Sequence, residues 1–185
     1  LALAPIASAD SLGPINFESP AYAVGNVNGQ QGWSKTGAYD SAIAGVSSFA
    51  NAAPFGFGSQ ALRISNKLMS GSFGDQTISP QLSQLAGESL ANTHYEASFK
   101  IGAAQAGEQS GLTMSVSPDD GTGDRMSYLS FADQADGVHV TFYDVKDPGP
   151  LGTTASFEPT EIATLSRTEA HSIRFVLDLC PGPFN

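Results

Sequence analysis

The sequence is poor in cysteine and in basic residues. Cys180 is the only cysteine among 185 residues, so the chain has no internal disulfide and packing must hold the fold. No cation flanks Cys180, so we expect a buried or strand-end thiol and not a reactive one. Only 8 Lys and Arg residues oppose 18 Asp and Glu residues, giving a formal net charge of −10. Such a surface repels phosphate backbones and anionic lipids, which argues against nucleic acid and charged membranes as partners.

Long apolar runs are also missing. No segment approaches the roughly 20 apolar residues that a membrane-spanning helix needs, so membrane insertion is not expected. The chain begins LALAPIASAD, in which Ala7-Ser8-Ala9 has the small-x-small form that signal peptidase accepts. We therefore expect residues 1–9 to be a signal-peptide remnant and the mature chain, from near Asp10, to be secreted or extracellular. A disordered apolar N-terminus of a cytosolic protein is the alternative.

Period-two hydrophobicity is the main structural signal that the chain does contain. In His94–Ile101 the apolar residues occupy every second position, which places one face of a strand on a core and leaves the other in water. Gly, Asp, Ser and Pro are frequent between such segments, as in antiparallel sandwiches. The same alternation recurs in Leu112/Met114/Val116, in Val138/Val140/Phe142 and in Ile173/Phe175/Leu177/Leu179. The expected fold is all-β, an antiparallel two-sheet jelly-roll sandwich.

These patterns predict one β-sandwich domain over residues 10–185. At 41% hydrophobic residues the chain has enough apolar material for one core, and it shows no linker or internal repeat. A single helical turn is predicted from Ser79-Pro80 to Gly87. Strands are predicted near Ile15–Ser19, Gly32–Asp40, Ala42–Val46, Ala61–Ser65, Thr93–Gly102, Gly111–Ser117, Arg125–Ala132, Gly137–Val145, Glu161–Leu165 and His171–Leu179.

The C-terminal pattern resembles an unfinished sheet. Ile173–Leu179 is a strongly apolar strand, and the turn Pro181-Gly182-Pro183 that follows normally leads to a partner strand. An apolar strand with an unpaired edge promotes aggregation. We therefore expect the natural protein to continue beyond Asn185.

Several residues together resemble a known class of domains. Phe17-Glu18, then Gln31-Gly32-Trp33 with Gly37 and Tyr39-Asp40, then Gln60–Asn66, look like the opening of concanavalin A-like (laminin-G-like) jelly-roll domains. The stretches Asp124–Phe131, Gly137–Asp144 and His171–Asp178 resemble uncharacterised exported bacterial domains of this class. The resemblance implies a jelly-roll fold. Members of the class bind glycans, cleave them or act as spacers, so it does not choose among these functions.

Catalysis on a polysaccharide requires groups that the sequence supplies poorly. A retaining glucanase needs two carboxylates ~5 Å apart, and the Glu-x-Asp-x-x-Glu strand motif of laminarinase-like members is absent. The nearest groupings, Asp133/Asp136 and Glu158/Glu161, lie in segments predicted to be turns, where carboxylates are ordinarily solvated. A lyase would use a Tyr/His pair with a cation, and His139, Tyr143 and Arg125 match this requirement only in part. We expect no catalytic residues, with a glycoside hydrolase or lyase as the alternative function.

Sugar binding without catalysis requires fewer specialised groups than cleavage of a polysaccharide does. Pyranose rings stack on aromatic side chains, and neighbouring amides and hydroxyls bond the sugar oxygens. The candidate ligand-binding residues are Tyr128, His139, Thr141 and Tyr143 on the polar faces of neighbouring strands, together with Trp33. For Trp33, packing in a core or at a sheet edge is the competing interpretation. The expected partner is an extracellular or cell-wall glycan, recognised without catalysis, and a structural spacer is a further alternative.

A metal ligand set is also present in the sequence. Asp119, Asp120 and Asp124 place three carboxylates on a Gly-rich turn, which suits Ca²⁺. The segment lacks the spacing and the closing Glu of an EF-hand loop, and Asp-Gly turns commonly join strands without metal. The resemblance adds a structural calcium near the first strand, which would involve Glu18. Calcium binding and an ordinary hairpin turn both remain open at this stage.

Overall fold

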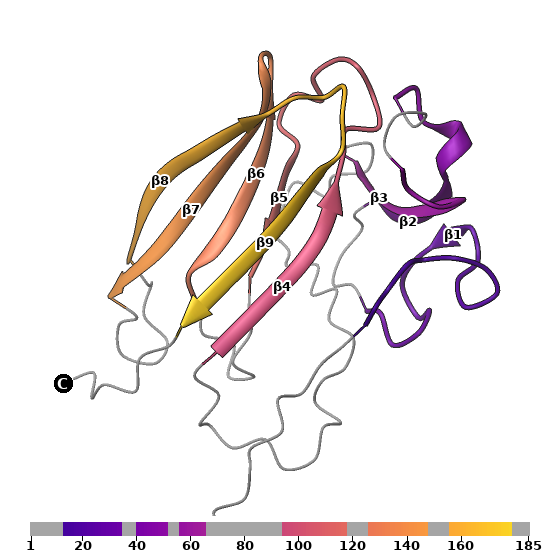
Figure 1. The fold of residues 1–185 in the computed structure, drawn as a ribbon, viewed down its shortest axis with the longest axis horizontal. Coiled ribbons are helices and arrows are strands. Elements are labelled where there is room, and N and C mark those ends of the chain that lie inside the picture. The colour runs from indigo at the N-terminus through magenta and orange to yellow at the C-terminus, as the bar shows by residue number, and fades with distance from the viewer. Residues whose placement is uncertain are drawn as a thin grey trace, which may run out of the picture.

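The computed structural model describes residues 13–34, 40–51, 56–65, 94–117, 126–147 and 156–178. Within these ranges the regular structure is antiparallel β-sheet, apart from the single 3-10 turn η1 (Val46–Ser48) (Figure 1). The strands are β1 (Gly25–Asn26), β2 (Asp40–Gly45), β3 (Gln60–Ser65), β4 (His94–Ile101), β5 (Thr113–Val116), β6 (Tyr128–Gln134), β7 (Gly137–Asp147), β8 (Ser156–Leu165) and β9 (His171–Asp178).

These strands form three sheets. The first has the order β1-β2-β3, the second pairs β4 with β9, and the third is the meander β5-β6-β7-β8. Figure 1 shows β4 and β9 lying across the meander, with β1–β3 beside them. The all-β antiparallel fold predicted from period-two alternation is confirmed.

The second and third sheets share one core. Along β4 the side chains alternate between exposed and half-buried, as the apolar period predicts. The buried members of the core are Phe175 from β9 and Leu129, Phe131 and Val140 from the meander. Phe99 of β4 meets Phe131 edge-on with ring centroids 6.0 Å apart, which joins the two sheets directly. The two sheets therefore face each other in a sandwich-like arrangement.

Most predicted strands are present, and β8 is longer than expected. The prediction began at Glu161, whereas β8 begins at Ser156. Pro159 and the charged residues around it hid the N-terminal half of this strand. β8 pairs only with β7 among the described strands, and an edge strand tolerates proline because its outer N–H groups need no partner. Glu158 and Glu161, expected on a turn, therefore lie in a strand.

The prediction of a strand at Ile15–Ser19 is wrong. Residues 13–18 form no strand, and Phe17 has a φ of 61°, in the left-handed region that bulky residues rarely adopt. Its ring instead packs on Tyr22 and Trp33, with centroids 5.2 and 5.4 Å away. Of the predicted strand Gly32–Asp40, Gly32 lies in a turn with a φ of 82°, Trp33 and Ser34 form no strand, and Asp40 begins β2, while residues 35–39 lie outside the described residues. The predicted helical turn at 79–87, residues 1–9 and Cys180 lie outside the described residues.

A second, smaller core lies beside the first sheet. Its buried members are Tyr22, Val27, Trp33 and Ile43. The Gln30 side chain accepts a hydrogen bond from the Ala23 N–H at 2.8 Å and donates to the Ala23 and Asn26 carbonyls at 3.0 and 2.7 Å. These bonds replace strand pairing in the loop and hold Trp33 against the sheet.

A buried ion pair connects the hairpins of the sandwich. Arg167 follows β8 and bonds Asp133 of β6, with 2.5 Å between Nη2 and Oδ1, and both side chains are only 9% exposed. Arg167 also donates to the carbonyls of Gln134, Ala135 and Gly137 around the β6–β7 turn. Asp133 Oδ2 accepts the Gln109 N–H at 2.7 Å. The interpretation of Asp133 as a solvated turn residue is therefore wrong, because it lies in a strand with its charge paired.

We predict that Arg167→Met lowers the free energy of unfolding by about 3–5 kcal/mol, because it leaves the Asp133 carboxylate buried without a partner. Urea denaturation measures the change. The control is Arg174→Met, which breaks an exposed pair with Glu96 and should cost ~1 kcal/mol or less. The double variant Arg167→Met/Asp133→Leu should recover much of the loss. Equal stabilities of Arg167→Met and the control would contradict this role.

We predict that Phe175→Ala lowers the free energy of unfolding by about 3–5 kcal/mol, since the side chain is 5% exposed and packs near Tyr95 and Phe142. Ile162→Ala, at a residue that is 57% exposed on β8, should change stability by about 0.5 kcal/mol or less. Thermal unfolding of the two variants provides the comparison. A near-neutral Phe175→Ala would mean that β9 faces the other way.

Candidate functional site

The outer face of the meander carries four of the predicted ligand-binding residues. Leu129 and Val140 point into the core, so the alternate residues of β6 and β7 point away from it. Tyr128 lies directly opposite Tyr143, and Thr141 lies opposite Ser130 in the same pair of strands. His139 follows on the same face, opposite Ala132. The structure thus brings Tyr128, His139, Thr141 and Tyr143 together on one face.

Three aromatic rings form a cluster on this face. The Tyr128 and Tyr143 rings stack with centroids 4.7 Å apart and planes 2° from parallel. Phe157 of β8 meets Tyr128 edge-on at 5.4 Å. All three residues are half-buried. We refer to Tyr128, Tyr143 and Phe157 as the aromatic face. Sequence reasoning missed Phe157 because it began the strand at Glu161, although Phe157 and Glu161 are separated by an even number of positions.

The stack limits how a ligand can approach. Each tyrosine covers one face of the other ring, so a ligand cannot enter between the two rings and must approach the cluster from outside the stack. Pro159 lies opposite Tyr143. The next outward pair along β7 and β8 is Thr141 and Glu161, which places a hydroxyl and a carboxylate beside the rings. The Glu161 side chain is 54% exposed. The face therefore combines apolar ring surface with hydroxyl and carboxylate oxygens, the chemistry that saccharides require.

His139 lies between two carboxylates at the end of this face. Its Nε2 is 2.8 Å from Asp136 Oδ1, and its Nδ1 is 3.1 Å from Glu161 Oε2. Hydrogen bonding to Asp136 and then to Glu161 raises the pKa of His139 above its usual 6.5. The same bond from His139 lowers the pKa of Asp136. Only 14% of the His139 side chain is exposed, so this residue lies on the polar face of β7 but is largely covered.

This environment bears on catalysis. The raised pKa favours the protonated imidazole, which has no lone pair with which to abstract a proton, so this environment disfavours His139 as the base of a lyase. The carboxylates Asp144 and Glu158 lie opposite each other and share Lys146, at 2.8 and 3.1 Å. Lys146 lowers the pKa of Asp144, whereas a general acid of a glycosidase needs a raised one.

Trp33 is not on this face. Its side chain is 8% exposed within the smaller core, and its Nε1 donates to the Tyr22 hydroxyl at 2.9 Å. Phe17 packs against its ring. The prediction that Trp33 stacks on a sugar is corrected accordingly, because its faces are covered by the protein itself.

The predicted calcium ligands Asp119, Asp120 and Asp124 lie outside the described residues. Among the residues that the structure does describe, no group of three or more His, Cys, Asp or Glu side chains is arranged to hold a metal ion. The Glu18 carboxylate accepts hydrogen bonds from the Ser59 hydroxyl and from the Gln60 N–H, the latter at 3.1 Å. These bonds lower the pKa of Glu18 and hold the start of β3.

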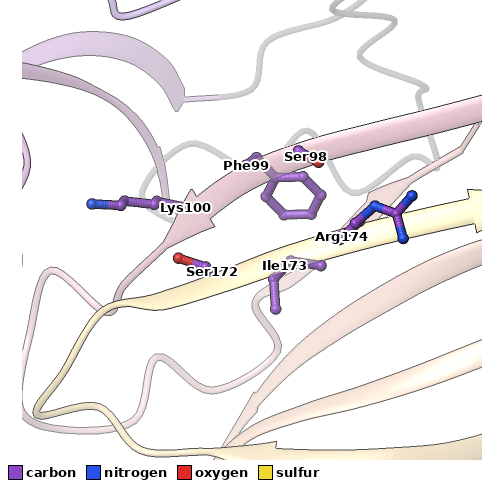
Figure 2. Close-up of a pocket in the computed structure, with 6 residues that line it drawn as sticks. All are labelled: Ser98, Phe99, Lys100, Ser172, Ile173 and Arg174. Carbon is purple, nitrogen blue, oxygen red and sulfur yellow. The ribbon is translucent and has the colours of Figure 1, made fainter.

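A shallow hollow of about 370 Å³ lies over β4 and β9 (Figure 2). Ser98 lies opposite Arg174, and Lys100 opposite Ser172. Arg174 is bonded to both oxygens of Glu96, at 2.8 and 2.9 Å, whereas Lys100 forms no ion pair with another described residue. Phe99 also lines the hollow, but its ring packs into the core against Phe131. The hollow therefore offers less to a saccharide than the aromatic face.

Searches against known protein families, curated proteins and solved structures find no match for this chain. Among the described residues, no helix is both long and apolar enough to cross a membrane.

We predict that the Tyr128–Tyr143 stack stabilises the fold by about 0.5–1.5 kcal/mol beyond simple burial. A double-mutant cycle with Tyr128→Ala and Tyr143→Ala, read by urea denaturation, measures this coupling. As a control, Tyr143→Ala combined with His94→Ala on the other sheet should give additive losses, since these sites share no partner. Additive losses for the two tyrosines as well would show that the rings do not interact in solution.

Proposed function

We propose that this chain is an exported, non-catalytic carbohydrate-recognition domain whose aromatic face binds the saccharide. The single observation that carries this proposal is the Tyr128, Tyr143 and Phe157 cluster on the outer face of the meander. A half-buried aromatic cluster on the solvent side of a sheet is not needed for the core, which the opposite faces of the same strands already fill.

The polar groups around the cluster support the same function. The apolar C–H faces of a pyranose gain dispersion energy and lose hydrating water against aromatic carbon, while its hydroxyls need hydrogen-bond partners at the rim. Thr141 and Glu161, opposite each other on β7 and β8, supply a hydroxyl and a carboxylate beside the rings. The sheet holds their backbones in fixed register, so little ordering is required on binding.

The setting of the domain is part of the proposal. The signal-like residues 1–9 favour export, which makes an extracellular or cell-wall glycan the natural partner. The facing antiparallel sheets are compatible with a concanavalin A-like jelly roll, the fold that the Gln31-Gly32-Trp33 and Gln60–Asn66 segments resemble. In this arrangement Trp33 has a packing role, and the aromatic face provides recognition.

The test is a glycan array that carries hexasaccharides of cellulose, xylan, mannan, laminarin and N-acetylchitin, followed by calorimetry of any that bind. We predict that Tyr143→Ala weakens binding at least tenfold, equivalent to ~1.4 kcal/mol, because it removes the ring surface. Tyr143→Phe keeps the ring and should retain most of the affinity. Circular dichroism confirms that both variants fold.

A control on the other sheet separates the two candidate surfaces. Lys100→Ala alters the hollow over β4 and β9 and should leave affinity unchanged. Loss of binding in Lys100→Ala but not in Tyr143→Ala would move the site to that hollow. Release of reducing ends or unsaturated uronates from the same glycans would instead establish an enzyme. Silence in every assay would favour a structural spacer.

A further inference from the structure

His139 lies at the aromatic face between two carboxylates, and their negative charges favour its charged form. Both ring nitrogens lie close to carboxylate oxygens, Asp136 at 2.8 Å and Glu161 at 3.1 Å. A neutral imidazole has a single N–H, so one carboxylate would face a nitrogen lone pair at this distance. The imidazolium donates its Nε2–H to Asp136 and forms an ion pair with Glu161 through Nδ1, which makes no well-aligned hydrogen bond. The charges around the ring therefore favour the protonated form.

The groups around His139 reinforce this choice. Asp136 comes from the β6–β7 turn and Glu161 from β8, while the strand neighbours Ala132 and Thr164 carry no charge. Arg167 also acts on Asp136, but its hydrogen bonds are directed to Asp133 and to the carbonyls of the turn. His139 therefore faces the negative charges of Asp136 and Glu161, while the positive charge of Arg167 is paired with Asp133. The His139 side chain is largely shielded from water, which limits screening of these charges.

Glu161 occupies an irregular point of the edge strand. The register of β7 and β8 shifts between Val140 and Thr141, where Glu161 lies opposite Thr141. A bulge disrupts the ladder locally, so side-chain contacts carry more of the pairing there. The charged bridge from Asp136 through His139 to Glu161 spans β7 and ties the β6–β7 turn to the bulge of β8. The same strand supplies Phe157 to the aromatic face.

We propose that His139 is a proton-controlled latch of the saccharide site: its charged ring holds Glu161 and the β8 bulge in place, and affinity for the saccharide falls when the ring loses its proton. This inference rests on the proposed function and adds its regulation by pH. Neutral His139 releases one carboxylate. Glu161 at 3.1 Å is the more weakly held of the two.

The direction of the pH dependence follows from the direction in which each pKa is shifted. Because contact with Asp136 and Glu161 raises the pKa of His139, the latch is complete below pH 6.5 and is lost as the pH rises through the raised value. Because His139 lowers the pKa of Asp136, that half of the bridge persists until the pH falls through the lowered value. The latch thus operates between these two limits, in mildly acidic to neutral solution.

The first experiment needs no ligand. NMR titration of the His139 ring should give a pKa above 6.5 in the wild type, and Glu161→Gln and Asp136→Asn should each lower it. Hydrogen exchange of the β8 amides, corrected for intrinsic rates, should quicken above that pKa in the wild type and at all pH values in Glu161→Gln. A His139 pKa at or below 6.5, or β8 exchange that ignores its ionisation, would overturn the latch.

The second experiment uses the array hexasaccharides that bind. Calorimetry at pH 5.5 and 8.5 should show at least threefold weaker binding at pH 8.5 for the wild type and no such change for His139→Gln. His94→Gln removes an exposed histidine of the other sheet and should keep the wild-type pH dependence. If His139→Gln does not fold, Glu161→Gln takes its place.

The two proposals fail in different ways. Equal affinity of the wild type at both pH values, with Tyr143→Ala still defective, overturns the latch and leaves carbohydrate recognition standing. Binding of no hexasaccharide at either pH overturns both.

Discussion

The pairing of Arg167 with Asp133 is the interaction on which the arrangement of the sandwich depends. Removing two charges from water is costly, and the cost is offset here because nearly every donor of the guanidinium finds an acceptor. Those acceptors belong to β6 and its turn, while Arg167 lies in the connection between β8 and β9. Its own carbonyl accepts a bond at 3.2 Å from Asn51, in the connection between β2 and β3. The side chain and the carbonyl of Arg167 together thereby connect three parts of the chain.

The core imposes the second constraint. Once Phe175 and Val140 point between the sheets, the period of two leaves no freedom for their neighbours, and Tyr143, Thr141 and His139 must lie on the outer face of the meander. The candidate site is therefore a consequence of packing. A shift of register by one residue would turn His139 toward the core and the core residues outward, at a cost of several apolar side chains. This coupling holds the aromatic cluster on the face opposite the core.

The residues that the sequence analysis missed or misassigned have one thing in common: their positions depend on contacts that leave no periodic pattern in the sequence. Phe157 lies on an edge strand rich in charge, where burial is too slight to produce clear alternation. Trp33 attracted attention as an aromatic near glycines, but the hydrogen bonds of Gln30 fold its loop inward, and no periodic pattern records side-chain bonds to the backbone. Asp133 and Asp136 are three residues apart. One is buried against Arg167 and the other bonds His139, a difference set by contacts from distant segments.

The sequence by itself determined the all-β class, most strand positions and the side of the sheet, opposite the core, on which Tyr128, His139, Thr141 and Tyr143 lie. These properties are local, because alternating hydrophobicity fixes the two faces of a strand wherever it pairs. Only the tertiary structure decided which strands are neighbours, and hence that Phe157 joins the two tyrosines and that Glu161 meets His139. Pairing between strands depends on the whole core and on register, which no single segment of the chain encodes.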